Sequence, residues 1–351
     1  MTSVAQTELV LPTARGQARV AELEHFSQIM TQLADRVGMK LSSRGWGYQL
    51  EGFRYITKAD FDRVEALINE CRQNGLLPVD FVAEEDARAF SGIEEPDTDS
   101  PQEYLGRWIK ATLKAEEEYT PDWWEDETYY IQMLVEKIDL KTLFEPICKQ
   151  YHVPIATSKG WSPILQRAEY ARRFSEAEAN GLECVLLYIG DHDPDGLRIS
   201  DSLRENLEQI QDGKWSDGTE GYDPADLTID RFGLNHDFIE QNHLTWIDNL
   251  ITGSGKDLAS PSHKNHNLPY VQEYLRKFGA RKCEANALVI VPDAAQNLCR
   301  ETIEKYLDSD ALDRFQAKRQ EIRDILEAFK KKTGLQDTLM KSLELIQNEG
   351  A

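Results

Sequence analysis

The chain has 351 residues, a hydrophobic content of 40% and a formal net charge of −22. Its length allows two domains, and its acidic balance argues against a protein that binds nucleic acid over its whole surface. No apolar run approaches the roughly 20 residues of a membrane span, so we expect no membrane partner. The five cysteines are scattered and odd in number. They predict a reducing compartment, taken to be the cytoplasm, without a zinc site or a disulfide framework.

The N-terminal part of the chain predicts a small helical domain. Residues 1–16 are polar and weakly patterned, which indicates a flexible tail. Apolar side chains then recur at helical spacing in three segments, at residues 17–38, 44–53 and 61–75. A capping box at Thr57 and Asp60 precedes the third helix, and residues 76–82 suit a short wing strand. This order is typical of a winged-helix DNA-binding domain, although many small helical domains share it. We expect a winged-helix-like domain over residues 17–83.

Two further segments, residues 84–128 and 311–351, stand on either side of the central region at 129–310. Residues 84–127 carry 15 acidic and 4 basic side chains, which account for half of the net charge. We interpret residues 84–128 as an acidic connector with a disordered first part and a helix over about 102–118. Apolar residues at helical spacing predict a C-terminal amphipathic helical segment over residues 311–351.

Between residues 129 and 310, apolar runs alternate with helical patterns. Strands are expected at 129–136, 153–156 and 184–190, and helices at 142–151, 163–180 and 197–210. This alternation predicts an α/β fold, a Rossmann-like parallel sheet with flanking helices. Ligands of such sheets bind outside the carboxyl ends of the strands, so polar residues that follow the strands are the candidate site.

Acidic residues follow two of these strands. Asp191, Asp193 and Asp195 come after the run at 184–190, and Glu136 ends the run at 129–136. Carboxylate oxygens suit Mg²⁺, with Mn²⁺ as an alternative. We predict that Glu136, Asp191 and Asp193 bind one or two Mg²⁺ ions over a phosphodiester. Glu136 is alternatively a general acid or base.

Other sites share part of this spacing. A calcium EF-hand needs a glutamate at the twelfth loop position, where the chain has Ser202, and a helix rather than a strand before the loop. A phosphatase of the haloacid-dehalogenase type also places two aspartates at a strand end, but Pro194 and Asp195 depart from its usual continuation. A solvated acidic loop without function is the remaining alternative. His192 is expected to point away from the metal.

The paired motifs resemble the TOPRIM domain of topoisomerases, primases and some nucleases. The sequence is similar to the branch that contains the topoisomerase VI A subunit and the meiotic double-strand-break protein. The first motif is Leu134-Val135-Glu136-Lys137, and the second is Gly190-Asp191-His192-Asp193-Pro194-Asp195-Gly196. The chain also resembles uncharacterised phage and plasmid proteins of this plan, which share segments like residues 75–80 and 284–288. The resemblance covers about residues 40–305.

The resemblance implies a TOPRIM domain over residues 129–310 behind the winged helix, DNA as substrate and a homodimer. It aligns Arg44 and Tyr48 with the branch's phosphate-orienting arginine and nucleophilic tyrosine, with Gly47 in place of a first tyrosine. Each tyrosine would act beside the partner's metal site. Lys137, Asp195 and Glu284 are supporting candidates. An ATPase subunit would be a separate partner, because the chain lacks a phosphate-cradling Gly-rich loop.

Three functions therefore stay open. The first is a DNA-cleaving protein of the topoisomerase VI A type, in which Tyr48 makes double-strand breaks by transesterification. The second is a TOPRIM nuclease that uses metal-activated water, with Tyr48 as a structural residue. The third is a non-catalytic DNA-binding or assembly module.

Overall fold

The computed structural model describes most of the chain, namely residues 9, 11–78, 81–82, 97–158, 164–211, 221–251 and 255–349. The chain divides into two compact units. Unit 1 consists of Met1–Asp86 and Tyr129–Tyr306, and unit 2 consists of Ala87–Thr128 and Leu307–Ala351. Each unit is described by itself.

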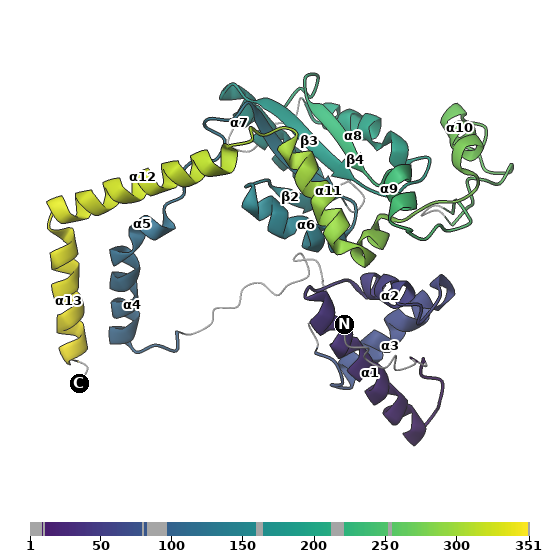
Figure 1. The fold of residues 1–351 in the computed structure, drawn as a ribbon, viewed down its shortest axis with the longest axis horizontal. Helices are drawn as coiled ribbons and strands as arrows, with labels where there is room; N and C mark the ends of the chain where they lie inside the picture. The colour runs from purple at the N-terminus through teal and green to yellow at the C-terminus, as the bar shows by residue number, and fades with distance from the viewer. Residues whose placement is uncertain are drawn as a thin grey trace. The chain divides into compact units, whose positions relative to one another are not determined.

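Unit 1 contains a four-stranded sheet, in which all neighbouring strands are parallel and the order is β2-β1-β3-β4 (Figure 1). Its strands are β1 (Tyr129–Val135), β2 (Ile155–Thr157), β3 (Glu183–Ile189) and β4 (Thr228–Gly233). In β1 and β3, every residue after the first is buried, as expected for strands that are covered on both faces. The predicted α/β fold with a parallel sheet is confirmed at this level.

Helices lie on both faces of the sheet. Those that contact the sheet are α6 (Ile138–Gln150), α7 (Ile164–Ala179), α8 (Ile199–Glu208) and α11 (Pro292–Glu304). Helices α9 (His236–Gln241) and α10 (Pro269–Phe278) come between β4 and α11 in the chain. Helices α6 and α11 contact each other and the sheet, as do α7 and α8. Successive residues of β1 face these two layers. The Gln132 side chain donates to the Tyr170 carbonyl in α7 (3.2 Å), and the Met133 sulfur contacts Cys148 in α6 (3.7 Å).

The strand order creates a switch point between β1 and β3. From β1 the chain passes through α6 to β2 on one side, then through α7 to β3 on the other side of β1. Connections that leave in opposite directions open a crevice at the carboxyl ends of the two strands, where ligands of doubly wound sheets bind. Glu136 and Asp191 follow these two strands.

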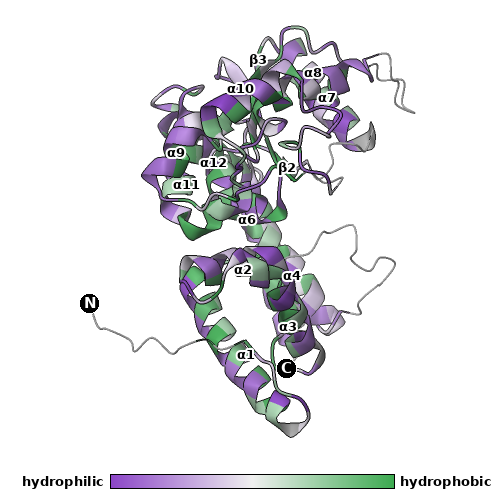
Figure 2. Cartoon of the chain, turned by 90° about the vertical axis from the view of Figure 1, so that its right-hand side faces the viewer, coloured by the Kyte–Doolittle hydropathy of each residue, from purple (hydrophilic) through white to green (hydrophobic). Residues whose placement is uncertain are grey.

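The N-terminal region of unit 1 is helical. Its elements are α1 (Gln17–Val37), α2 (Ser43–Gly52), the 3₁₀ turn η1 (Lys58–Asp60) and α3 (Phe61–Gln73). These bounds confirm the three predicted helices, and Figure 2 shows hydrophobic and hydrophilic residues alternating along α1. The predicted cap is present, because the Asp60 carboxylate accepts hydrogen bonds from the Thr57 backbone N–H (3.0 Å) and hydroxyl (2.9 Å).

The predicted wing strand over residues 76–82 is wrong for the residues that are described there. Only Val82 pairs, in a single bridge with Leu41. The N–H groups of Leu76 and Leu77 donate to the Cys71 carbonyl at the end of α3, at 2.9 and 3.2 Å. Because these N–H groups already donate to a carbonyl oxygen at the C-terminal end of α3, they are not available for hydrogen bonds to a neighbouring strand.

The N-terminal helices pack directly against the α/β part of unit 1. Asp139 in α6 is fully buried and accepts hydrogen bonds from the backbone N–H and the hydroxyl (2.6 Å) of Ser42. Gly45 makes this approach sterically feasible, because a Cβ there would lie 2.8 Å from an Asp139 carboxylate oxygen. From the sequence we predict separate domains over residues 17–83 and 129–310. In the structure, Met1–Asp86 and Tyr129–Tyr306 belong to one compact unit.

Unit 2 joins two segments that are distant in sequence. Its helices are α4 (Pro101–Leu113), α5 (Ala115–Glu118), α12 (Ala311–Lys332) and α13 (Leu335–Glu349). Helix α4 packs against α13, and α5 packs against α12. The helix expected over 102–118 is thus present but interrupted at Lys114. Of the predicted disordered part, residues 94–101, the first three lie outside the described residues, whereas Ser100 caps α4 and Asp97 pairs with Arg107 at 2.9 Å.

Two further observations concern membranes and thiols. In the part of the chain that the structure covers, no helix combines the length and the apolar character that a membrane span requires. All five cysteines are free and buried. Their thiols pack in the interior, so none of them forms a disulfide.

Candidate functional site

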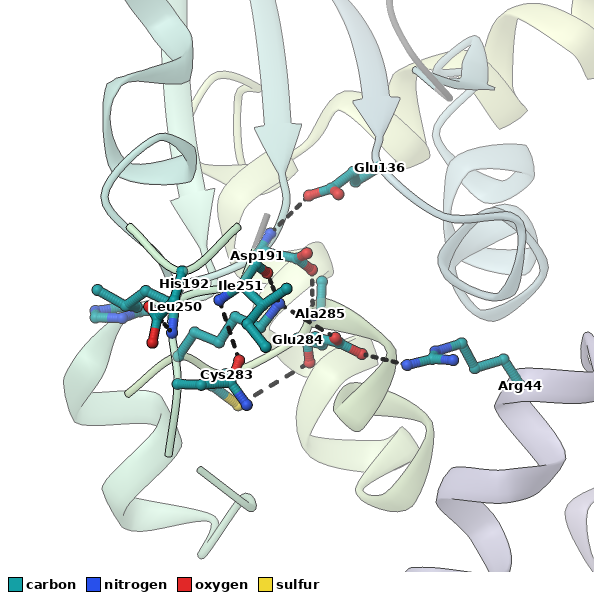
Figure 3. A network of polar contacts seen from close by, with 12 residues as sticks. Arg44, Glu136, Asp191, His192, Leu250, Ile251, Cys283, Glu284 and Ala285 are labelled. Atoms are coloured by element: carbon teal, nitrogen blue, oxygen red, sulfur yellow. Dashed lines mark hydrogen bonds and ion pairs between the residues drawn. The ribbon is translucent and has the colours of Figure 1, made fainter. Parts of the chain in front are cut away.

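Three carboxylates predicted from the sequence meet at the carboxyl edge of the sheet. Glu136 directly follows β1, and its Oε2 atom accepts a hydrogen bond from the Asp191 backbone N–H at 2.8 Å (Figure 3). Glu136, Asp191 and Asp193 line one pocket of about 720 Å³. The site therefore lies at the switch point between β1 and β3.

Glycines permit the close approach of these groups. A Cβ at Gly190 would lie 2.4 Å from the Tyr188 hydroxyl and 2.7 Å from Glu136 Oε2. At Gly196 a Cβ would lie 2.2 Å from the Asp191 carbonyl oxygen. At Gly196 the clash is with a backbone atom, so the turn after β3 depends on glycine there, whereas a side chain at Gly190 would require Tyr188 and Glu136 to move.

Hydrogen bonds fix the two aspartates. Asp191 Oδ1 accepts from the Ala285 backbone N–H (2.7 Å), and Asp193 Oδ1 accepts from the Gly196 backbone N–H (2.6 Å). Burial raises the pKa of both carboxyl groups above the usual range, and in Asp191 the Glu136 charge adds to this shift. The Lys137 ammonium opposes it, because it lies 3.3 Å from Asp191 Oδ2 and also pairs with Glu136.

The donor set fits a hard divalent cation. Its three carboxylates are crowded and partly buried, and Lys137 forms ion pairs with two of them. Oxygen ligands of this kind suit Mg²⁺ or Mn²⁺. No group of three or more His, Cys, Asp or Glu side chains within the described ranges is already spaced as a metal cluster. Because Lys137 pairs with Glu136 and Asp191, it would have to leave these carboxylates when a cation binds.

The rest of the pocket wall is acidic as well. The lining includes the acidic residues Asp195, Asp201 and Glu205 and the arginines Arg167 and Arg198. Among all the lining residues, acids outnumber bases. A phosphate group would be repelled from such a pocket unless cations neutralised it.

Asp195 is anchored through an aromatic side chain. Its Oδ1 atom accepts a hydrogen bond from the Tyr270 hydroxyl at 2.9 Å, and the Arg198 guanidinium lies 4.9 Å from the centre of the Tyr270 ring. Tyr270 lies at the start of α10, far from the acidic motif in sequence. Because 75 positions separate Tyr270 from Asp195, no local motif connects the two residues.

His192 is not among the residues that line the pocket. Its ring packs edge-on against Phe278 (4.8 Å) and Trp246 (5.4 Å), and its Nδ1 lies 2.9 Å from the Tyr274 hydroxyl. Burial lowers the pKa of His192 to about 4, so the imidazole is neutral near pH 7. The backbone of His192 pairs with Cys283, which places the segment after Cys283 beside the acidic turn.

Arg231 in β4 forms hydrogen bonds with the backbone of the acidic turn. It was not among the residues predicted from the sequence. Its guanidinium donates to the carbonyl oxygens of Gly196 (2.8 Å) and Asp191 (3.2 Å). Strand β4 also contains Thr228 and Asp230, so the arginine does not stand out in its local sequence.

Tyr48 does not lie in the pocket. It is 0% exposed, its ring packs edge-on against Phe61 (4.9 Å), and its hydroxyl donates to Glu284. Burial, with the Glu284 charge adding to it, raises the pKa of Tyr48 well above its ordinary value. The phenol is therefore neutral, and the aligned Arg44 lies 3.7 Å from the same Glu284.

Comparisons with known proteins found no match. No protein-family model, no curated protein and no solved structure matches the chain.

Proposed function

We propose that the chain is a TOPRIM-like enzyme that cleaves DNA phosphodiesters with Mg²⁺, or with Mn²⁺ in its place. The observation that carries the proposal is the convergence of Glu136, Asp191 and Asp193 in one pocket at the switch point of a parallel sheet. Bound cations would also offset the acidic lining, which otherwise repels a phosphodiester. DNA as the substrate comes from the motif resemblance.

The residues of the pocket have separable roles in this proposal. Glu136, Asp191 and Asp193 would hold the cation, which supplies the positive charge that activates water and stabilises the leaving oxygen. The Ala285 N–H holds Asp191 in place (2.7 Å). Lys137, once released from the carboxylates, would be a phosphate contact.

Burial of Tyr48 favours water over tyrosine as the nucleophile. A nucleophile must reach phosphorus, whereas Tyr48 is 0% exposed and its hydroxyl is bonded to Glu284. The transesterase of the topoisomerase VI A type is the second candidate. It is favoured by Arg44 next to Tyr48 and by the Ala285 contact that links this region to Asp191. A homodimer and an ATPase subunit belong to that candidate.

We expect Tyr48→Phe to keep its Mg²⁺-dependent DNA cleavage within about threefold of the wild type and to leave DNA ends free of protein. The same variant should lose about 1.5–3 kcal/mol of unfolding free energy, because it removes a hydrogen bond to a charged acceptor. The measurements are a cleavage assay with Mg²⁺ or EDTA, a gel test for protein attached to DNA, and denaturant unfolding. Tyr119→Phe, at a tyrosine that is 48% exposed, is the matched control.

Two outcomes would contradict the proposed nuclease and favour one of the other functions. Protein linked covalently to DNA ends, with both linkage and cleavage lost in Tyr48→Phe, would establish the tyrosine mechanism instead. No cleavage by the wild type with either cation, with DNA binding unchanged in Asp191→Ala, would leave the non-catalytic module.

A further inference from the structure

A second polar cluster lies between α2 and the segment after Cys283, outside the carboxylate pocket. Its centre is the Glu284 carboxylate, which accepts a hydrogen bond from the Tyr48 hydroxyl. Arg44 Nη2 lies 3.7 Å from Glu284 Oε2, and Lys282 Nζ lies 3.6 Å from Glu284 Oε1. Two cations and a hydroxyl thus converge on one carboxylate.

Lys58 adds a third cation to this cluster. Its ammonium lies 4.9 Å from the centre of the Tyr48 ring. The Nζ atom is buried and has no hydrogen-bond partner among the residues that the structure describes. Burial lowers the pKa of Lys58, while the charges of Glu51 and Glu284 act in the opposite direction. A buried ammonium in this situation is stabilised by any anion that approaches it.

The cluster is accessible from one side. The Arg44 side chain is 47% exposed, whereas those of Glu284 and Lys282 are 14% exposed. Two other carboxylates lie nearby. The Glu65 carboxylate lies 3.8 Å from the Arg44 guanidinium. Glu51 is close enough to the cluster for the Glu284 charge to act on it: burial raises the pKa of Glu51, and the Glu284 charge adds to this shift. Of these carboxylates, Glu284 alone contacts both Arg44 and Lys282.

We propose that Arg44, Lys58 and Lys282 form a binding site for a backbone phosphate of DNA, and that Glu284 occupies it as an internal anion until the phosphate displaces it. Carboxylate and phosphate oxygens accept the same charge-assisted hydrogen bonds from arginine and lysine. The proposal takes its ligand class, DNA, from the proposed function.

The position of the cluster suits a neighbouring phosphate of the cleaved strand. Figure 3 shows one network of polar contacts with Arg44 at one end and Glu136 at the other. Glu284 is followed directly by Ala285, whose N–H holds Asp191. A strand bound at Arg44 would therefore be placed beside the carboxylate pocket, and release of Glu284 would free the Tyr48 hydroxyl.

The test measures the affinity for a short fluorescent DNA duplex in EDTA, where cleavage does not occur. Glu284→Gln should bind about 3- to 10-fold more tightly than the wild type, because it removes the competing charge and keeps the side-chain shape. Arg44→Gln and Lys282→Gln should bind more weakly by a similar factor. Each should also reduce the slope of log K against log salt by about 1.

Glu65→Gln is the matched control, since it removes the same charge at a similar distance from Arg44 but outside the convergence point. Equal effects of Glu284→Gln and Glu65→Gln would overturn the proposal, as would wild-type affinity in Arg44→Gln and Lys282→Gln. If Glu284→Gln does not fold, Glu284→Asp, which withdraws the charge by one methylene, should show a smaller increase in affinity. Because the assay contains no divalent cation, its result is independent of whether the wild type cleaves DNA.

Discussion

Asp191→Asn is expected to lower Mg²⁺-dependent DNA cleavage by on the order of 10²-fold or more. Asparagine has nearly the same shape and its side-chain oxygen still accepts the Ala285 N–H, so the turn after β3 keeps its anchor. The substitution removes one negative charge from the proposed cation site and one of its oxygen ligands. The initial rate of cleavage of a labelled duplex, measured over a range of Mg²⁺ concentrations, separates weaker cation binding from slower chemistry.

Asp201→Asn is the matched control for this substitution. Asp201 lines the same pocket and pairs with Arg198 at 3.1 Å. Its side chain is 65% exposed, and within the described residues it forms no hydrogen bond with Glu136, Asp191 or Asp193. We expect its cleavage rate to stay within about threefold of the wild type, in line with the small effects of exposed charges. Equal loss of activity in both variants would mean that pocket charge as a whole, rather than a cation at Asp191, controls cleavage.

The acidic site could be predicted because its signal is local. Strands β1 and β3 are apolar runs, and an acid stands at the end of each: Glu136 directly after β1, and Asp191 one residue further on, after Gly190. The residues that support the site could not be predicted in this way. Ala285 reaches Asp191 across 94 positions, and Arg231 across 40. Such contacts depend on how distant segments pack, which no short pattern in the sequence records.

The environment of Tyr48 shows the same limit. Helical spacing placed Tyr48 on a helix, and the motif alignment suggested a nucleophile, but neither indicates which surface of α2 is covered. A better signal is the set of glycines in α2, because each costs about 1 kcal/mol of helix propensity. A Cβ at Gly52 would lie 2.8 Å from Ile290, and one at Gly47 would lie 3.1 Å from the Phe61 ring. Glycines inside a helix thus mark where another element packs closely.

Ion pairs within unit 2 explain part of the acidic composition of the connector at residues 84–128. Several of its carboxylates pair with cations of α12. Glu127 pairs with Arg314, and Glu116 pairs with Lys330. The two segments lie about 200 residues apart, so composition alone assigned them to separate regions. Charge complementarity within unit 2 accounts for part of the excess of acids over residues 84–127.

Gly196→Ala is expected to lower DNA cleavage by about 10- to 100-fold. The new Cβ would lie 2.2 Å from the Asp191 carbonyl oxygen, which is a backbone atom and cannot rotate away as a side chain does. The turn must therefore open, and the Gly196 N–H that holds Asp193 (2.6 Å) moves with it. The strain should also reduce the unfolding free energy by about 1–3 kcal/mol, which denaturant unfolding measures alongside the cleavage rate.

Gly106→Ala separates the local clash from a general effect of replacing glycine. Gly106 lies within α4, and its added Cβ would meet only a Leu343 methyl group at 3.7 Å, an ordinary contact. Because alanine favours a helix over glycine by up to about 1 kcal/mol, this variant should be as stable as the wild type or more so, with unchanged cleavage. A Gly196→Ala protein that cleaves DNA at the wild-type rate would show that the positions of Asp191 and Asp193 do not control the reaction. Cleavage would then have to be assigned to another site.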